Sequence, residues 1–194
     1  LSHAAERFNF IYDKFIRESG ANVYFSVVPD KNMFIAEKGG YLALDYAELV
    51  SSMREKMGFA EYIDIIPMLS EEDYYFTDSH WRQENITDVA SHIATSMGAV
   101  FSDEFTVNTV ETPFYGTYYG QAALPMEPET MYLMESDLLA GCQVYLYTDD
   151  RYTQIYDMEK LSAKDPYDIF LSGPQSLLRI ENPNAETDRE LVIF

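Results

Sequence analysis

The feature that most constrains the fold is an almost wholly apolar run, VYFSVV, at residues 23–28. Its β-branched and aromatic residues, followed by Pro29, predict a strand that is buried on both faces. Residues 1–18 before it predict an amphipathic helix, and Gly20 is placed to end that helix. The apolar positions of the helix share one face: Leu1, Ala5, Phe8, Tyr12, Phe15 and Ile16. A helix, a glycine and a buried strand in this order favour an α/β fold.

The remaining pattern continues to alternate between helices and strands. Asp45 is suited to cap the next helix, because an aspartate at that position can accept a hydrogen bond from the first turn. In chain order the sequence predicts a helix over 45–58, a short strand from 61 into a loop by 69, a helix from 85 or 87 to 97, and strands over 143–148, within 165–182 and over 190–194. A length of 194 residues fits one domain, so we expect residues 1–194 to form a single α/β domain.

Composition limits the classes of partner. Hydrophobic residues make up 47% of the chain, with 16 Tyr and 12 Phe, which is ample for a packed core. The 33 acidic residues outnumber the 13 basic ones, and the formal net charge is −20. Binding to a phosphate backbone depends on clustered Lys and Arg, so a nucleic-acid partner is excluded. The acidic residues are spread along the chain, which is typical of a solvated surface.

Targeting signals are not evident in the sequence. No apolar run approaches the roughly 20 residues that a membrane helix needs. No signal peptide is recognisable either. The chain begins with Leu1 inside a helical pattern, so we expect a leader or a membrane anchor outside this fragment.

The stretch YYFTDSHWRQENITDVA, residues 74–90, carries the strongest candidate for chemistry. Asp78 and His80 are separated by one residue, and in an extended backbone such side chains point the same way. The carboxylate can then accept the Nδ1–H of His80, which fixes the tautomer and leaves Nε2 free to act as a base. A pair of this kind activates a serine hydroxyl for acyl transfer. The alternative is a loop hydrogen bond without catalytic meaning. Trp81 is expected to point to the opposite side.

Other catalytic and metal-binding patterns are weak or absent. His3 and His92 fall on the polar faces of predicted helices, and neither stands at a metal-ligand spacing from His80. Cys142 is the only cysteine, so no internal disulfide forms, and its apolar neighbours indicate a buried thiol. No glycine-rich nucleotide loop and no nucleophile-elbow motif occur. We therefore predict neither a metal nor a cofactor.

An aromatic and glycine-rich segment, FYGTYYG, occupies residues 114–120. Tyr115 and Tyr118 among the glycines can stack on sugar rings in a cleft, or they can form a packed loop. Both interpretations remain open from the sequence.

Three segments resemble the DHHW family of bacterial proteins. Residues 75–81, YFTDSHW, are similar to its signature of an aromatic residue followed by Thr-Asp-x-His-Trp, with Ser79 where a first histidine is common. The segment VYFSVVPDKNMFIAE, 23–37, is similar to its strand followed by a Pro-Asp-Lys loop, and DIFLSG, 168–173, is similar to a later portion. The similarity extends over most of the chain.

The resemblance implies a flavodoxin-like, SGNH hydrolase-like three-layer α/β/α sandwich. It also implies acyl-ester chemistry on extracellular polysaccharide and an extracytoplasmic location, either secreted or membrane-anchored. By position Asp78 is the orienting acid and His80 the general base. The family's nucleophilic serine follows a strand like Leu191–Phe194, so we expect it beyond residue 194 and expect the sandwich to be incomplete at the C-terminus. The chain departs from the family at Pro174, where related proteins often carry a polar residue that helps to form an oxyanion hole, because proline has no N–H to donate. Gly173 can still offer its own N–H.

Two hypotheses for function follow. The first is a serine-dependent acyl-ester hydrolase or O-acetyltransferase that acts on a polysaccharide. The second is a non-catalytic carbohydrate-binding or envelope-assembly protein with the same fold. In both, carbohydrate is the partner, no obligate protein partner is predicted, and the expected substrate-binding residues are Trp81, Tyr115, Tyr118 and Gly173.

Overall fold

The computed structural model describes residues 2–101, 104–123 and 125–194. The chain forms two compact units, and each is built from two stretches of sequence. The first contains residues 1–74 and 85–101, and the second contains residues 75–84 and 102–194. The single-domain expectation is not tested by this division and stays a prediction.

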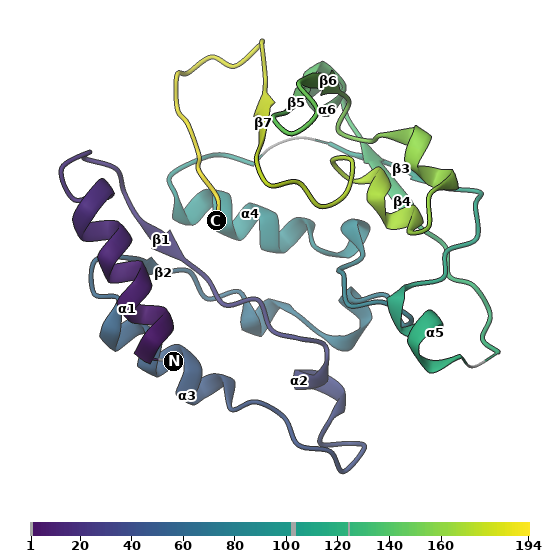
Figure 1. Cartoon of the computed structure of the whole chain (residues 1–194), viewed down its shortest axis with the longest axis horizontal. Helices are drawn as coiled ribbons and strands as arrows, with labels where there is room; N and C mark the ends of the chain where they lie inside the picture. The colour runs from purple at the N-terminus through teal and green to yellow at the C-terminus, as the bar shows by residue number, and fades with distance from the viewer. Residues whose placement is uncertain (1, 102–103, 124) are drawn as a thin grey trace. The chain divides into compact units, whose positions relative to one another are not determined.

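The first unit consists of helices around one short pair of strands (Figure 1). The strands β1 (Tyr24–Phe25) and β2 (Glu61–Tyr62) run parallel, with Tyr24 opposite Glu61. The helices are α1 (Ser2–Ile11), which continues into a π-helical turn at Tyr12–Ile16, α2 (Asn32–Ile35), α3 (Tyr46–Lys56) and α4 (Thr87–Ser96). Short 3₁₀ turns follow β2 at Ile66–Met68 and Glu71–Asp73.

The core of the first unit lies between α1, α3 and β1. Ala5, Met53 and Met57 are buried together, and Phe25 packs against them. Tyr12 stacks on Phe59 with ring centroids 4.2 Å apart. The prediction of the apolar face of α1 is only partly correct, because the core contacts a narrower strip of the helix than the sequence predicts.

Two of the predicted core residues of that helix are exposed. Phe8 and Phe15 point to solvent in this structure, whereas Ala5 and Tyr12 face the core. Leu1 lies outside the described residues. The sequence pattern correctly predicts the helix but overestimates the width of its buried face.

The predicted strand over 23–28 is much shorter than expected. Only two of its residues are in β1, and Val28 is 63% exposed. Its backbone pairs on one side with β2, where the Glu61 N–H donates to Val23 O and the Ile63 N–H donates to Phe25 O, both at 2.9 Å. A strand that is buried on both faces needs a layer of structure on each face. In the described first unit, β1 packs against the layer formed by α1 and α3.

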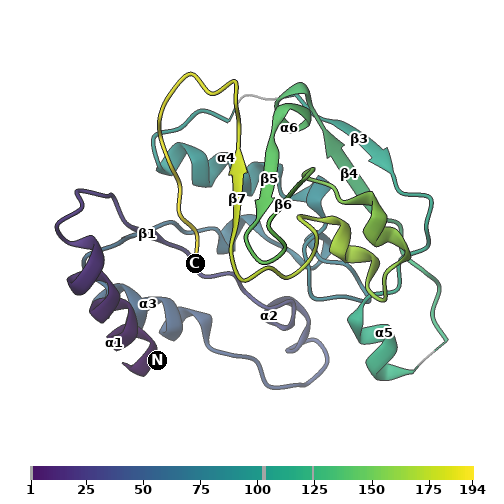
Figure 2. The ribbon, with the colours of Figure 1, turned by 45° about the horizontal axis from the view of Figure 1, so that its top comes forward.

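The second unit is mainly antiparallel (Figure 2). Strand β3 (Thr106–Thr109) pairs with β4 (Tyr132–Glu135), and a second sheet has the order β6 (Arg151–Thr153), β5 (Gln143–Leu146), β7 (Leu178–Glu181). Its α-helices are α5 (Thr117–Ala122) and α6 (Asp137–Gly141). Short 3₁₀ turns lie at Met158–Ser162, at Pro166–Ile169 and at Gln83–Asn85.

The core of the second unit surrounds one tyrosine of the candidate motif. Tyr75 is fully buried, with its ring centroid 4.9 Å from that of Phe114. The buried residues of this cluster are Tyr75, Val110, Phe114, Met131, Leu133 and Ile169. The residues that follow Tyr75 are therefore anchored to the core at their start.

The fold is mixed α/β, as predicted, with helices at 46–56 and 87–96 and a strand at 143–146 inside the predicted ranges. In the described part of the chain the strands form three small sheets, so the three-layer sandwich is not confirmed. Of the two strands predicted within 165–182, the later one is present as β7, whereas the earlier one is replaced by a 3₁₀ turn at Pro166–Ile169 and a left-handed turn at Leu171–Gly173.

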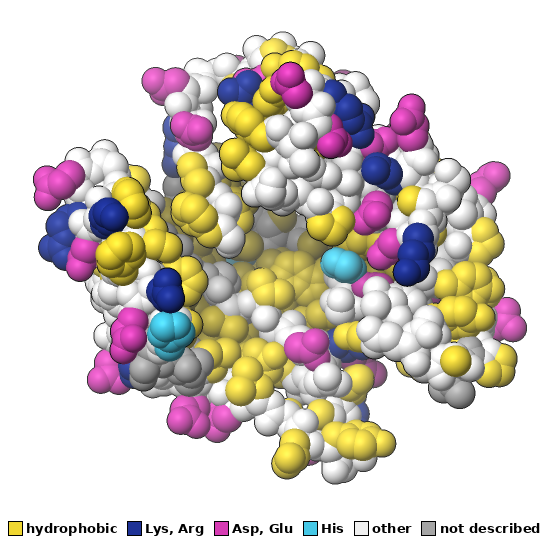
Figure 3. All heavy atoms as spheres, in the orientation of Figure 1, with side chains coloured by type: hydrophobic (Ala, Val, Ile, Leu, Met, Phe, Trp, Pro, Cys, Tyr) yellow, Lys and Arg dark blue, Asp and Glu magenta, His cyan; other side chains and the backbone are white. Residues whose placement is uncertain are grey.

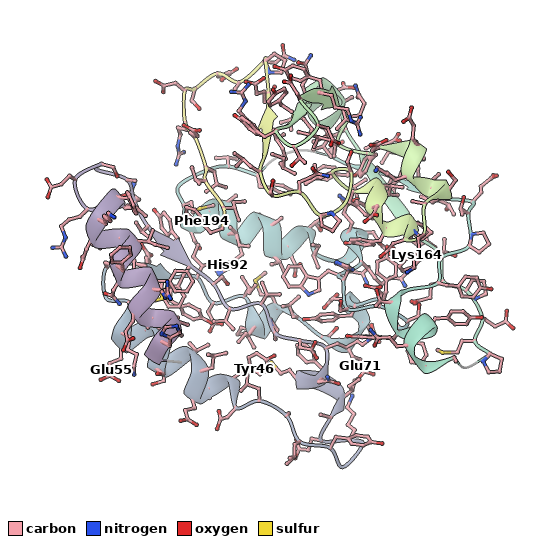
Figure 4. The ribbon with its side chains drawn as sticks, viewed as in Figure 1. Tyr46, Glu55, Glu71, His92, Lys164 and Phe194 are labelled. Atoms are coloured by element: carbon pink, nitrogen blue, oxygen red, sulfur yellow. The ribbon has the colours of Figure 1, made fainter. Side chains whose placement is uncertain are left out.

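The prediction of a strand over 190–194 is wrong in this structure. The segment is irregular and exposed, and Phe194, labelled in Figure 4, is 95% exposed. Its residues have high strand propensity, but a strand is stabilised by pairing, and no described segment pairs with it.

The cap of α3 gives a first prediction. The Asp45 carboxylate accepts the Glu48 N–H at 2.9 Å. Asp45→Ala is expected to lower the free energy of unfolding by about 0.5–2 kcal/mol, measured by urea unfolding, because it removes this bond. Asp45→Asn retains an accepting oxygen and serves as the control. Equal stability of the Ala variant and the wild type would contradict the capping role.

Candidate functional site

The candidate site is a tight loop over residues 75–80. The Tyr75 N–H donates to His80 O at 3.1 Å and closes the loop. Inside it, the predicted contact is present, with His80 Nδ1 2.5 Å from Asp78 Oδ1. The same carboxylate oxygen accepts the backbone N–H of His80 at 3.0 Å. Two bonds from one residue therefore fix the histidine ring relative to Asp78.

Asp78 is completely buried, with 0% of its side chain exposed. Its second oxygen, Oδ2, accepts the Thr117 N–H at the start of α5, at 2.7 Å. Burial alone would raise the pKa of Asp78. The hydrogen bonds from the His80 ring, from Thr117 N–H and from His80 N–H outweigh it and hold the pKa of Asp78 well below its usual range. The aspartate is therefore an anion throughout the physiological pH range.

His80 is held on one side and accessible on the other. Its side chain is 48% exposed. Tyr167 stacks on the imidazole with ring centroids 4.0 Å apart and an interplanar angle of 16°. In the described part of the chain no group is hydrogen-bonded to Nε2. The hydrogen bond to Asp78 raises the pKa of His80, burial lowers it, and the charges of Asp78, Asp165 and Asp168 add to the raising effect.

The loop is pressed against the start of α5. The Tyr118 N–H donates to Thr77 O at 2.9 Å, and the Gly116 N–H donates to Thr77 Oγ1 at 3.0 Å. A Cβ atom at Gly116 would lie 2.3 Å from Thr77 O and 2.4 Å from Asp78 Cβ. Glycine is therefore required at this position by the close approach of two backbones.

This contact brings the aromatic segment beside the dyad. Tyr115 is 41% exposed, and its ring lies 4.5 Å from that of Tyr119 at 42°. Tyr118 is half-buried. The structure thus places Tyr115 and Tyr118 on the segment that contacts the Asp78 loop, and their role in substrate binding stays a prediction.

Trp81 is partly buried, and its indole nitrogen is inaccessible to solvent. The residue follows the dyad directly, but a polar contact from its indole to a substrate would require movement of the ring. Its predicted role in substrate binding is therefore limited to the exposed part of its ring.

Gly173 lies in a turn of three successive left-handed residues, Leu171, Ser172 and Gly173, with φ of 55°, 64° and 74°. Its N–H donates to Phe170 O at 3.1 Å. The positive φ favours glycine, and a Cβ atom there would lie 2.4 Å from Asp168 Oδ1, so a side chain would require the Asp168 carboxylate to move. An oxyanion role for Gly173, which stays a prediction, requires release of the bond to Phe170.

Other kinds of site are not present among the residues that the structure describes. No group of three or more His, Cys, Asp and Glu is arranged to hold a metal ion. None of the described helices has the length and apolar character needed to cross a membrane. His92, labelled in Figure 4, is exposed on α4, as predicted. On the face shown in Figure 3, Lys and Arg are scattered among Asp and Glu.

A cavity of about 620 Å³ in the second unit lies away from the dyad. Its lining includes Glu135, Asp137 and Tyr156 and contains none of the predicted site residues. The candidate dyad is carried by the loop over residues 75–80, and the His80 side chain is 48% exposed.

The sequence analysis did not predict four residues that contact the dyad or its loop: Gly116, Thr117, Glu129 and Tyr167. The contacts of Gly116 and Thr117 with the loop span 39 residues, and those of Glu129 span 52 or more. The only sequence signal for Gly116 and Thr117 was their place in the glycine-rich aromatic segment 114–120. The glycines indicate a close backbone approach, but the sequence does not identify the loop that they contact. Glu129 has no local sequence pattern that distinguishes it from other acids.

Solved structures share this fold. A DHHW family protein from Eubacterium siraeum matches with a TM-score of 0.66 and 19% identity, over 94% of this chain and 65% of its own. Bacillus cereus PatB1 with a sulfonyl adduct matches with a TM-score of 0.69 and 15% identity, over 95% and 68%. A further PatB1 structure gives 0.64 and 14%, over 95% and 70%.

These matches confirm the resemblance to the DHHW family at the level of the fold. The chain spans about two thirds of the length of these proteins, with 65% coverage of the DHHW protein. No protein-family model and no curated protein matches the sequence.

The close approach at Gly116 gives a second prediction. Gly116→Ala is expected to lower the free energy of unfolding by about 1–3 kcal/mol, because the new methyl group meets backbone atoms that cannot rotate away. Gly120→Ala, within α5, is the matched control, since a Cβ there meets nothing within 4 Å. Urea unfolding of both variants measures the difference, and equal stabilities would show that the approach is looser than described.

The pKa of His80 gives a third prediction. Titration of the His80 imidazole by NMR is expected to give a value above its ordinary 6.5. Asp78→Asn should lower it, because the variant removes the main cause of the shift. The stability that His80 contributes is present below about 6.5 and is lost as the pH rises through its raised folded-state pKa. An unchanged titration in Asp78→Asn would disprove the pairing.

Proposed function

We propose that this chain belongs to a serine-dependent acyl-ester hydrolase or O-acetyltransferase that acts on an extracellular polysaccharide. The observation that carries the proposal is the Asp78–His80 pair, in which a buried anion holds Nδ1 and the opposite edge of the ring is accessible. This is the arrangement of acid and base that activates a serine hydroxyl. His80 is the general base, and Asp78 is the orienting acid.

In the first half of the proposed reaction, Nε2 of His80 takes the proton of the serine hydroxyl while the serine oxygen attacks the ester carbonyl. The negative charge moves to the carbonyl oxygen, and Asp78 stabilises the imidazolium. Collapse of this intermediate breaks the bond to the leaving alcohol. His80 returns its proton to that alcohol, and the acyl group stays on the serine.

In the second half, His80 accepts a proton from the incoming nucleophile, which attacks the acyl-serine. Water as nucleophile gives hydrolysis, and a sugar hydroxyl gives transfer of the acyl group. The serine recovers the proton from His80 when the intermediate collapses. The same pair of residues therefore serves either activity, and access of water decides between them.

The aromatic segment supports a carbohydrate substrate. Tyr115 is exposed and adjacent to the loop that carries the dyad, and tyrosine rings present an apolar face with a polar tip. With a net charge of −20, a neutral or basic glycan is favoured over an anionic one. Trp81 and Tyr118 are proposed to border the same surface.

The comparisons support the proposal through the fold and one chemical detail. The Bacillus cereus PatB1 structure carries a sulfonyl adduct. An adduct of this kind forms on an activated nucleophile, as this mechanism requires. Following the DHHW resemblance, we propose that the nucleophilic serine lies beyond Phe194, that the whole protein completes a three-layer α/β/α sandwich, and that it acts outside the cytoplasm.

Hydrolysis of p-nitrophenyl acetate by the longest natural form of the protein gives a fourth prediction. His80→Ala is expected to lower kcat/KM by about 10²- to 10⁴-fold, because it removes the general base. The rate of the wild type should rise with pH as His80 loses its proton, with a midpoint above 6.5 that reflects its raised pKa.

His92→Ala is the matched control, since His92 is an exposed histidine on α4 in the first unit. Its rate is expected to equal that of the wild type. If neither the wild type nor His80→Ala exceeds the background rate on this ester or on O-acetylated glycans, the enzyme hypothesis fails and carbohydrate binding by glycan array becomes the next measurement.

A further inference from the structure

The Glu129 side chain is hydrogen-bonded to the loop that carries the dyad. Its Oε1 accepts the Phe76 N–H at 2.7 Å, and its Oε2 accepts the Thr77 N–H at 2.6 Å. The Thr77 hydroxyl donates to the same Oε2 at 2.5 Å. One carboxylate therefore receives three hydrogen bonds from two adjacent residues, immediately before Asp78.

Glu129 is itself fixed by its neighbours. Its N–H donates to Phe114 O at 2.8 Å, and the Phe114 N–H donates to its carbonyl oxygen at 3.0 Å. Arg82 Nη1 lies 3.7 Å from Oε1, and only 13% of the Glu129 side chain is exposed. Glu129 is thus bonded through its backbone to a fully buried phenylalanine of the core, which fixes its position independently of its contacts with the loop.

Thr77 connects the two sides of the loop. Its hydroxyl donates to Glu129 and accepts the Gly116 N–H at 3.0 Å, while its carbonyl oxygen accepts the Tyr118 N–H at 2.9 Å. The next residue, Asp78, receives the Thr117 N–H. Displacement of Thr77 would therefore move the acceptor that orients His80.

We propose that Glu129 is a positioning residue that acts on His80 through Thr77 and Asp78. Hydrogen bonds to a carboxylate are roughly twice as strong as those between neutral groups. The three hydrogen bonds from Phe76 and Thr77 to the Glu129 carboxylate fix the position and direction of the backbone that precedes Asp78. This inference rests on the proposed function for its catalytic consequence, but the geometric part stands on the contacts alone.

The test compares Glu129→Gln with Glu135→Gln in the full-length protein. Gln keeps the shape of Glu129, but its amide offers only one oxygen, so its NH₂ group faces a backbone N–H that loses its acceptor. A misplacement of about 1 Å can cost 10²-fold in rate, and we expect kcat for an activated ester to fall about 10- to 100-fold with little change in KM. Glu135 accepts only an exposed Asn108 amide and is the matched control.

The second measurement is the NMR titration of His80, which needs no activity. Glu129→Gln is expected to move the titration midpoint of His80 toward its ordinary value, and Glu135→Gln is expected to leave it unchanged. Equal midpoints in the two variants would overturn the inference. If the wild type shows no esterase activity while the midpoint shifts as expected, the proposed function fails and the positioning role of Glu129 stands.

A second pair of variants covers the case in which Glu129→Gln does not fold. Thr77→Val removes the hydroxyl between Glu129 and Gly116, and Thr77→Ser keeps it. A shifted His80 titration in Thr77→Val but not in Thr77→Ser supports the inference. The same titration in both would overturn it, because the loop would then be placed without the hydroxyl and its carboxylate partner.

Discussion

The buried carboxylate of Asp78 is the constraint on which the candidate site depends. An ionised carboxylate removed from water destabilises the folded state by several kcal/mol unless it is hydrogen-bonded. Asp78 has 0% exposure, and it receives the His80 ring, the His80 N–H and the Thr117 N–H. Removal of any one donor would leave the charge undercompensated. The segments that supply these donors must therefore dock together for the unit to form.

This requirement explains the backbone arrangement around the loop. Thr117 can donate to Asp78 only if α5 begins against the loop, and that approach leaves no room for a side chain at Gly116. On the other side the Glu129 carboxylate accepts the N–H groups of Phe76 and Thr77. The dyad is consequently assembled before any substrate binds, and its orientation does not have to be produced during the reaction.

The sequence predicts the local part of this arrangement and not the long-range part. The Asp78–His80 contact follows from a spacing of two residues, and the Asp45 cap of α3 follows from the residue type at a helix start. Both depend on neighbours in the chain. The partners Thr117 and Glu129 are brought in by packing across 39 and more residues, for which a single sequence contains no rule.

The errors have a related cause. The pattern at 190–194 has strand propensity, but a strand also needs a partner, and none pairs with it among the described residues. The exposed Phe8 and Phe15 show that apolar spacing marks a face of a helix without saying how much of it another element covers. Periodicity therefore identifies elements, whereas their burial is decided by the tertiary contacts they find.

The same contacts set the strength of His80 as a base. Asp78, Asp165 and Asp168 all favour the imidazolium, so the ring is a stronger base than a free histidine but is less often unprotonated at neutral pH. Burial of the ring lowers the pKa of His80 and so opposes these charges. Tyr167 covers one face of the imidazole. The charges of Asp165 and Asp168 and the burial of the ring thus act in opposite directions on the pKa of His80. A change in either would alter the pH at which the base is available without touching the Asp78–His80 bond.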